Sequence, residues 1–115
     1  MKTISIPDGT KVKLQAVISS DAVVLTGIVV EGKIIRQSQL YKFSFDLDDI
    51  TILKNKIVNI GTTFFLPDGT NIDQIFNTTQ VAYFIVYNNE TYELDVKKEK
   101  MLSSLFVSST KVKFI

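Results

Sequence analysis

The side chains with the clearest chemical potential in this sequence are lysines close to its C-terminal end. Five of them lie within the last twenty residues: Lys97, Lys98, Lys100, Lys111 and Lys113. Ammonium groups can replace the counterions of a phosphate backbone, so a lysine cluster could follow a nucleic acid. The net charge is only +1, so any such attraction must be local. The alternative is a solvated lysine-rich surface with no ligand.

Tyrosine side chains could supply the second half of a nucleic-acid site. Tyr41, Tyr83, Tyr87 and Tyr92 all fall in segments that we expect to be strands. Bases of single-stranded RNA stack on exposed aromatic rings while lysines contact the phosphates. The alternative is core packing, with the hydroxyls reaching the surface. Arg36 is the only arginine, whereas proteins that read bases in a duplex use arginine most often.

A four-residue repeat, TKVK, occurs at residues 10–13 and again at residues 110–113. If both copies lie in one sheet, Lys11 and Lys13 would join the C-terminal lysines in one basic strip. Alternating lysine and valine is also typical of exposed edge strands, where lysine deters pairing. In that case the repeat is a coincidence.

Residues for catalysis or metal binding are scarce. The sequence has no histidine and no cysteine, which removes the commonest general base, thiol nucleophiles and most transition-metal sites. Glu90, Glu93 and Asp95 are the candidate carboxylates for hydrolysis, but no motif supports them. Three of the residues at 46–49 are aspartates (Asp46, Asp48 and Asp49), and they could bind a hard cation, although a turn explains them better. We therefore predict a protein without catalytic activity, metal or cofactor.

Two copies of the tetrapeptide PDGT, at residues 7–10 and 67–70, mark tight turns. Proline presets the first central position and glycine takes the left-handed conformation. The first copy predicts a hairpin that joins strands at 3–6 and 10–19. The second follows a strand at 62–66 and predicts a short helix, capped from Thr70. Because the flanking patterns differ, the repeat indicates local turn chemistry and not a functional motif.

Further strands are predicted by hydrophobic alternation in the middle of the chain. Residues 23–30 and 33–36 flank a Glu-Gly turn, and residues 41–47 alternate regularly. Residues 50–60 are ambiguous, since Leu47, Ile50 and Leu53 also suit one helical turn. We favour a turn at 46–49 and a strand from Lys56 to Ile60.

The last third of the chain predicts a hairpin, a short helix and a final strand. With Asn89 and Glu90 at the turn, Tyr87 would face Tyr92, Ile85 would face Leu94 and Tyr83 would face Val96, all on one apolar face. The spacing of Met101, Leu102, Leu105 and Phe106 predicts a helix. Residues 110–114 predict a strand.

These elements amount to about seven short strands and two short helices, which is a mainly β (α+β) fold. Residues 1–115 have the length of a single domain. Many short strands in a small chain close into a barrel or pack as a sandwich. We expect a small β-barrel whose open ends are capped by the two helices. OB-like, SH3-like and PUA-like barrels all fit this pattern.

Nothing in the sequence indicates a membrane or secretory protein. No run approaches eighteen apolar residues, and no apolar stretch follows the first lysine. We therefore expect a cytoplasmic protein without membrane insertion.

The opening IPDGTKVKL and the later VVLTGIVVEG resemble the PrgU-like small proteins of conjugative plasmids and mobile elements in Gram-positive cocci. The resemblance covers about the first third of the chain. It implies a PUA-like pseudobarrel with an RNA-binding, regulatory role that limits the production of surface or transfer proteins.

Three hypotheses for function follow. The first is a non-catalytic binding and regulatory module that engages single-stranded RNA through Lys97, Lys98, Lys100, Lys111 and Lys113, joined by Lys11 and Lys13. The second is a structural or adaptor protein of a phage or mobile element, acting through protein partners or as a homo-oligomer. The third, less favoured, is a carboxylate hydrolase. A surface that combines basic and aromatic side chains in one groove would favour RNA.

Overall fold

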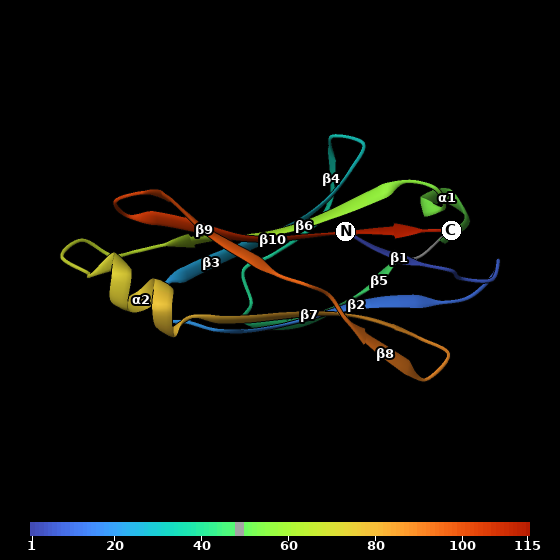
Figure 1. The fold of residues 1–115 in the computed structure, drawn as a ribbon, viewed down its shortest axis with the longest axis horizontal. Helices are drawn as coiled ribbons and strands as arrows, with labels where there is room; N and C mark the ends of the chain where they lie inside the picture. The colour runs from blue at the N-terminus through green and yellow to red at the C-terminus, as the bar shows by residue number, and fades with distance from the viewer. Residues whose placement is uncertain (48–49) are drawn as a thin grey trace.

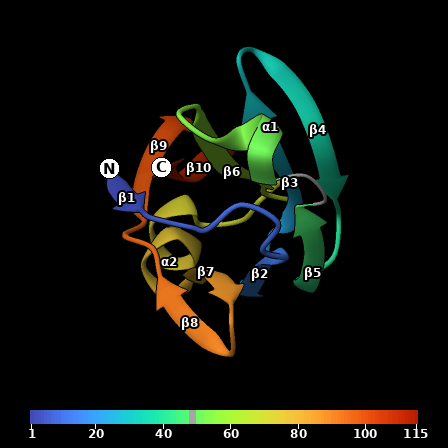
Figure 2. The same ribbon diagram turned by 90° about the vertical axis from the view of Figure 1, so that its right-hand side faces the viewer.

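Two β-sheets that face each other make up most of the computed structural model, which describes residues 1–47 and 50–115 (Figures 1 and 2). The first, sheet A, has the strand order β1 (Lys2–Ile4), β10 (Leu105–Phe114), β6 (Ile57–Phe65), β3 (Val23–Val30) and β4 (Lys33–Ser38). β9 (Lys97–Leu102) also pairs with β10, beside β1 on the same edge. Sheet B has the order β5 (Lys42–Leu47), β2 (Val12–Ser19), β7 (Gln80–Tyr87) and β8 (Glu90–Glu93).

The two helices lie at opposite ends of the molecule (Figure 1). They are α1 (Ile50–Leu53) and α2 (Ile72–Thr78). Ile50 and Leu53 of α1 are buried, as is Ile75 of α2. No helix in residues 1–47 and 50–115 is long and apolar enough to cross a membrane.

The core fills the space between the sheets and is divided in two by hydroxyl groups. Strict alternation on β2, β3, β6 and β10 turns every second side chain inward. One apolar cluster contains Leu14, Ile60 and Ile85, and a smaller one beside α2 contains Phe64 and Phe106. Between them, a row of small hydroxyl residues crosses the inner face of sheet A in direct register: Thr26, Thr62 and Ser108.

Tyr83 of sheet B completes this row and joins it to the opposite sheet. Its hydroxyl lies 2.5 Å from the Thr62 hydroxyl and 2.9 Å from the Ser108 hydroxyl. The Thr62 hydroxyl lies 2.8 Å from that of Thr26. All four side chains are buried, so their hydrogen bonds offset the cost of removing polar groups from water.

Both PDGT turns form, but only the second has the predicted sequel. Gly9 and Gly69 each have φ of 78°, as predicted. The predicted hairpin after the first turn is wrong, because β1 pairs in parallel with β10 while β2 enters sheet B. A turn of this type fixes the local chain direction and not the partner strand. The second turn leads into α2, although Asn71 and not Thr70 caps the helix.

The predicted helix at residues 101–106 is also wrong, because β9 and β10 form a hairpin there. Leu105 and Phe106 begin the long strand β10, and Met101 and Leu102 end β9 as exposed residues. β9 ends at Leu102 and β10 begins at Leu105, with two serines in the turn between them. The apolar residues on the two sides of this turn therefore have the same sequence spacing as one face of a helix. The alternation of buried and less buried residues continues to Phe114 over ten residues, and it is a stronger indication of a strand than one helical turn is of a helix.

The β7–β8 hairpin has the predicted apolar face but a different register. Ile85 pairs with Tyr92, and Tyr87 pairs with Glu90, so each partner lies two residues earlier than we expected. The turn residues are Asn88 and Asn89, with φ of 49° and 62°, and asparagine tolerates this conformation well. A shift of two residues keeps side chains on the same face, which explains why Tyr83, Ile85 and Leu94 are still buried.

The ambiguous segment at residues 50–60 forms both predicted structures, first a helical turn and then a strand. The helical turn α1 comes first, and the predicted strand follows as β6, beginning at Ile57. The predicted turn at Asp46–Asp49 lies partly outside the described residues, which end at 47 and resume at 50. The hairpin of β3 and β4 forms as predicted, with Glu31 and Gly32 at positive φ.

The mainly β class is confirmed, but the described residues contain ten strands and no closed barrel. No hydrogen-bonded pairing among residues 1–47 and 50–115 joins β4 to β5 or β8 to sheet A. β4 is mostly exposed and projects away from the two layers (Figure 1). It therefore buries too little apolar surface to seal that side of the molecule.

Replacing Tyr83 with Phe should lower the free energy of unfolding by about 1–3 kcal/mol, because buried hydroxyls would lose a partner. Urea unfolding would measure the loss. Tyr87→Phe is the matched control, since its hydroxyl makes only long contacts of 3.2 and 3.4 Å near the surface. Equal losses in the two variants would contradict a special role for the buried hydroxyl.

The stability of the protein should fall above about pH 10. Burial raises the pKa of the Tyr83 hydroxyl above its ordinary value of 10.0, against smaller opposite effects of Ser108 and Thr62. The folded protein therefore keeps a proton that the unfolded chain loses. The resulting stabilisation is complete below the unfolded pKa and disappears as pH rises through the folded one. Unfolding measured from pH 9 to 11, compared with Tyr83→Phe, would show a shallower decline in the variant.

Candidate binding face on sheet A

The predicted lysine cluster is divided among three surfaces, and only part of it lies on one face. Lys97, Lys111 and Lys113 lie on the face of sheet A that points away from sheet B, which we call the outer face of sheet A. Their inward neighbours on β10, Thr110 and Val112, are buried. Lys97 lies directly opposite Ser109, which belongs to the same outward set.

Lys98 and Lys100 point to the other side of β9 and hold α2. The Lys98 ammonium donates to the carbonyl oxygens of Phe76 and Thr79 at 2.6 and 2.9 Å. These carbonyls belong to the C-terminal end of the helix, where a cation is favourable. Lys100 forms an ion pair with Asp73, and both ammonium groups lie over the Phe76 ring. The two lysines therefore have a structural role in this fold.

The TKVK repeat does not bring its two copies together. β2, which contains Lys13, belongs to sheet B, and β10, which contains Lys111 and Lys113, belongs to sheet A. The interpretation that places both copies in one sheet is therefore wrong. Lys11 is exposed just before β2, and Lys13 lies 4.0 Å from Asp46 of β5.

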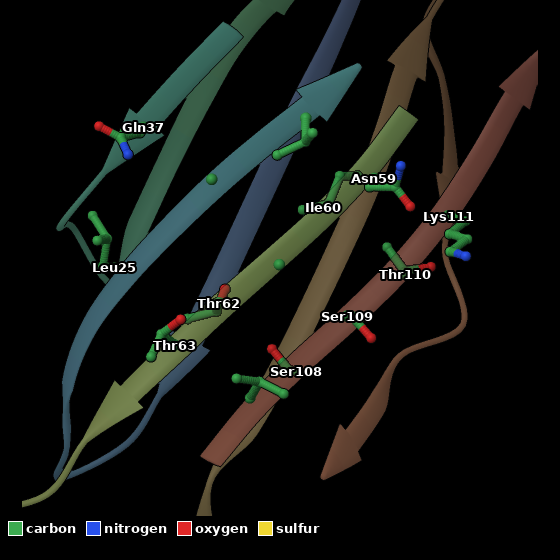
Figure 3. A pocket seen from close by; sticks show the side chains of 14 residues that line it. Leu25, Gln37, Asn59, Ile60, Thr62, Thr63, Ser108, Ser109, Thr110 and Lys111 are labelled. Carbon is green, nitrogen blue, oxygen red and sulfur yellow. The ribbon is translucent and has the colours of Figure 1, made fainter. Parts of the chain in front are cut away.

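A shallow trough crosses the outer face of sheet A (Figure 3). Its volume is about 340 Å³. Three residues in direct register form its floor: Gly27, Gly61 and Ser109. At the two ends of this row, Gln37 faces Gly27 and Lys97 faces Ser109. The two glycines have no side chain, so the backbone is uncovered there, and the space above Gly27 is open.

Polar and apolar walls border the trough on opposite sides. Asn59 and Lys111 are cross-strand neighbours on one side (Figure 3). On the other side, Leu25 and Val107 flank Thr63. The trough therefore separates a half of the face that carries lysines from a half that is largely apolar.

The apolar half ends in four side chains that cross four strands in register, which we call the apolar row: Val23, Phe65, Leu105 and Leu102. Val23 is 59% exposed, Phe65 45% and Leu102 66%. Single exposed apolar residues are common on protein surfaces, but a contiguous group marks a contact site more often. The described structure leaves this row open to solvent.

A second hollow, the notch, opens where β9 and β1 leave a gap along β10. β9 pairs with β10 as far as Ser109, and β1 begins to pair at Val112. The notch has a volume of about 410 Å³ and is lined by charges of both signs, with Lys2, Lys97 and Lys111 beside Asp95 and Glu99. It meets the trough at Ser109, Thr110 and Lys111.

The tyrosines do not form a platform beside the lysines. Tyr83 is buried. Tyr87 and Tyr92 stack on each other with ring centroids 5.2 Å apart, and the Lys2 ammonium lies 5.7 Å from the Tyr92 centroid. A hydrogen bond with Glu90 raises the pKa of Tyr92. Tyr41 is partly exposed and donates to the Ala22 carbonyl at 2.5 Å.

The candidate carboxylates do not assemble into a recognisable catalytic or metal site. Glu90 and Glu93 are exposed on β8, and Asp95 is exposed beyond it. Among residues 1–47 and 50–115, no group of three or more acidic side chains could hold a metal ion. The candidate cation site at Asp46–Asp49 includes residues outside the described part of the chain, so the structure gives no test of it.

Compared with known proteins, the chain matches no family model, no curated protein and no solved structure. The resemblance to the PrgU-like proteins therefore stays a prediction.

Sequence reasoning missed the apolar row. The sequence shows that its four residues are apolar, but it does not show that they are neighbours. Phe65 and Leu105 were assigned to a strand end and a helix, and Leu102 to that same helix. Only the register of β6, β9 and β10 shows that they are neighbours. A strand partner cannot be read from the alternation of a single strand, so this surface had no detectable signal.

Replacing Lys98 with Gln should destabilise the protein by about 1 kcal/mol or more, because two helix carbonyls lose a charged donor. Lys97→Gln is the matched control, since Lys97 is its exposed neighbour and should leave stability unchanged. Thermal unfolding followed by circular dichroism would compare them. A Lys98 variant as stable as the control would show that these bonds contribute nothing.

Proposed function

We propose that this protein is a non-catalytic binding module that holds a protein partner on the outer face of sheet A. The single observation that supports the proposal most is the apolar row, which crosses four hydrogen-bonded strands in register and is open to solvent. The partner that fits this face has apolar side chains at one end of its contact segment and acidic side chains at the other.

The dimensions of the face suit a protein contact. Four strands spaced about 4.8 Å apart and about nine residues long give a surface of roughly 600 Å². A stable protein interface buries about 800 Å² on each partner, and weaker transient contacts bury less. The outer face of sheet A is therefore large enough for a modest, reversible contact.

Charge complementarity determines the expected orientation of the partner. The lysine half of the face carries Lys97, Lys111 and Lys113, and the apolar half carries Val23, Phe65 and Leu102. Apolar contacts supply most of the affinity of an interface, while charges at its edge guide association. An apolar segment followed by acidic residues would satisfy both halves at once.

Single-stranded RNA is the competing ligand, and it has less support. The lysines predicted to bind it are distributed over three surfaces, and two of them hold α2. On the outer face of sheet A, the exposed aromatic side chain among the described residues is Phe65. It lies in the apolar row, on the other side of the trough from Lys111 and Lys113. The PUA-like relationship and the regulatory role on a mobile element stay predictions that would favour RNA.

Two labelled peptides of about ten residues would test the proposal. Both carry the same four apolar residues, followed by glutamates in one and lysines in the other. Fluorescence anisotropy should show that the acidic peptide binds at least about tenfold more tightly, a difference of about 1.4 kcal/mol. Phe65→Ser should weaken this binding, since it removes an apolar contact.

The matched control is Ile52→Ser, which changes another exposed apolar residue, 60% exposed against 45% for Phe65, on α1 at the other end of the molecule. It should bind the acidic peptide like the wild type. An oligouridine of similar length provides the other arm of the experiment. If it binds while neither peptide does, and if Lys97→Gln, Lys111→Gln and Lys113→Gln together abolish that binding, the protein is an RNA-binding module and the proposal is wrong.

A further inference from the structure

The strand β5 has one edge with no hydrogen-bonded partner strand among the described residues. β5 is the outermost strand of sheet B and pairs only with β2 among the described residues. An edge strand offers a row of backbone donors and acceptors to any extended chain that approaches it. Lysines on an edge strand discourage such pairing, and β9 carries three of them, Lys97, Lys98 and Lys100. β5 carries only one lysine.

The backbone orientation of β5 can be derived from one hydrogen bond. The amide of Ile18 on β2 donates to the carbonyl of Tyr41 at 2.7 Å. Backbone groups of alternate residues point to opposite edges of a strand. Because Tyr41 turns toward β2, so do Phe43 and Phe45. Lys42, Ser44 and Asp46 therefore direct their N–H and C=O groups to the free edge.

The side chains of β5 are self-complementary about Ser44. In an antiparallel pairing with a second copy, Ser44 can face Ser44 of that copy. Lys42 then lies opposite Asp46, and by symmetry Asp46 lies opposite Lys42. All three of these residues are exposed. Opposite charges in direct cross-strand positions stabilise such a pair.

The aromatic residues of β5 fit the same register. Phe43 of one copy lies opposite Phe45 of the other, in the narrower type of antiparallel pair where side chains come closest. Within one chain, the two rings already contact each other at 4.9 Å between centroids, and Phe45 is only partly buried. Tyr41, which is 42% exposed, would be covered by the end of the second β5.

We propose that two copies of this protein associate through β5, joining their four-stranded B sheets into one continuous sheet across a two-fold axis at Ser44. Each copy uses the same edge, as an isologous dimer requires. The six backbone bonds of Lys42, Ser44 and Asp46, two Lys–Asp pairs and two Phe–Phe pairs form the contact. The outer face of sheet A is not used, so this dimer does not depend on the proposed partner.

Charge reversal with rescue gives a sharp test. Sedimentation velocity over a range of concentrations should show self-association of the wild type. Lys42→Glu places two like-charged pairs in the interface and should raise the dissociation constant about tenfold or more. Lys42→Glu combined with Asp46→Lys restores both opposite-charge pairs between the copies and should lower the dissociation constant again, below that of Lys42→Glu alone. Recovery is incomplete because the double variant also replaces the contact between Lys13 and Asp46 within each copy with a pair of like charges.

Two further variants keep the test decisive. Lys33→Glu on β4 makes the same change in net charge as Lys42→Glu but should leave association unchanged. Ser44→Pro removes an N–H group from the free edge without removing a bond to β2, a change that edge strands tolerate, and it should abolish the dimer. Circular dichroism would verify that each variant is folded.

The proposal is overturned if the wild type remains monomeric at every concentration. It is also overturned if Lys42→Glu associates as strongly as the wild type, or if the double variant fails to recover association. A dimer that survives both Lys42→Glu and Ser44→Pro would use another surface of the molecule.

Discussion

The arrangement of the two sheets depends on the hydrogen bonds of the Tyr83 hydroxyl with Thr62 and Ser108. Tyr83 belongs to sheet B, and the hydroxyl residues that it contacts, Thr62 and Ser108, belong to sheet A. A buried hydroxyl is costly unless every partner is in place. Slippage of either sheet by one residue would separate the Tyr83 hydroxyl from Thr62 and Ser108, whereas purely apolar layers could adjust. The network therefore specifies how the layers align as well as contributing stability.

The row of buried hydroxyl residues also explains why the outer face of sheet A has its particular shape. Gly27, Gly61 and Ser109 are each adjacent in sequence to a buried hydroxyl residue, and the register aligns them on the opposite face of sheet A. The trough therefore lies over the polar division of the core. On the outer face, the apolar row lies on the side of the trough near α2, and Lys111 and Lys113 lie on the side near β1. The same strand register therefore aligns the residues on both faces of sheet A.

Local features of this fold could be predicted from the sequence, and pairings between distant segments could not. The turns at Gly9 and Gly69, the Glu31–Gly32 hairpin and the inward face of Tyr83 and Ile85 all depend on neighbouring residues, and all were correct. The first hairpin failed because β1 has only three residues and its partner, β10, lies at the other end of the chain. The lysine site divided for a related reason. Lys97 and Lys98 are adjacent in sequence, but a strand turns adjacent side chains to opposite faces.

The parallel pairing of β1 with β10 has a consequence for how the protein is made. Lys2 pairs with Val112 and Ile4 with Phe114, so this pairing joins residues farther apart in sequence than any other strand pairing of the described residues. During synthesis on a ribosome, β1 emerges before β10 and stays without this partner until the segments between them have followed. Loop closure over such a separation is slow compared with hairpin formation. Three residues expose little edge during that wait, and the shortness of β1 limits the opportunity for pairing with a neighbouring nascent chain.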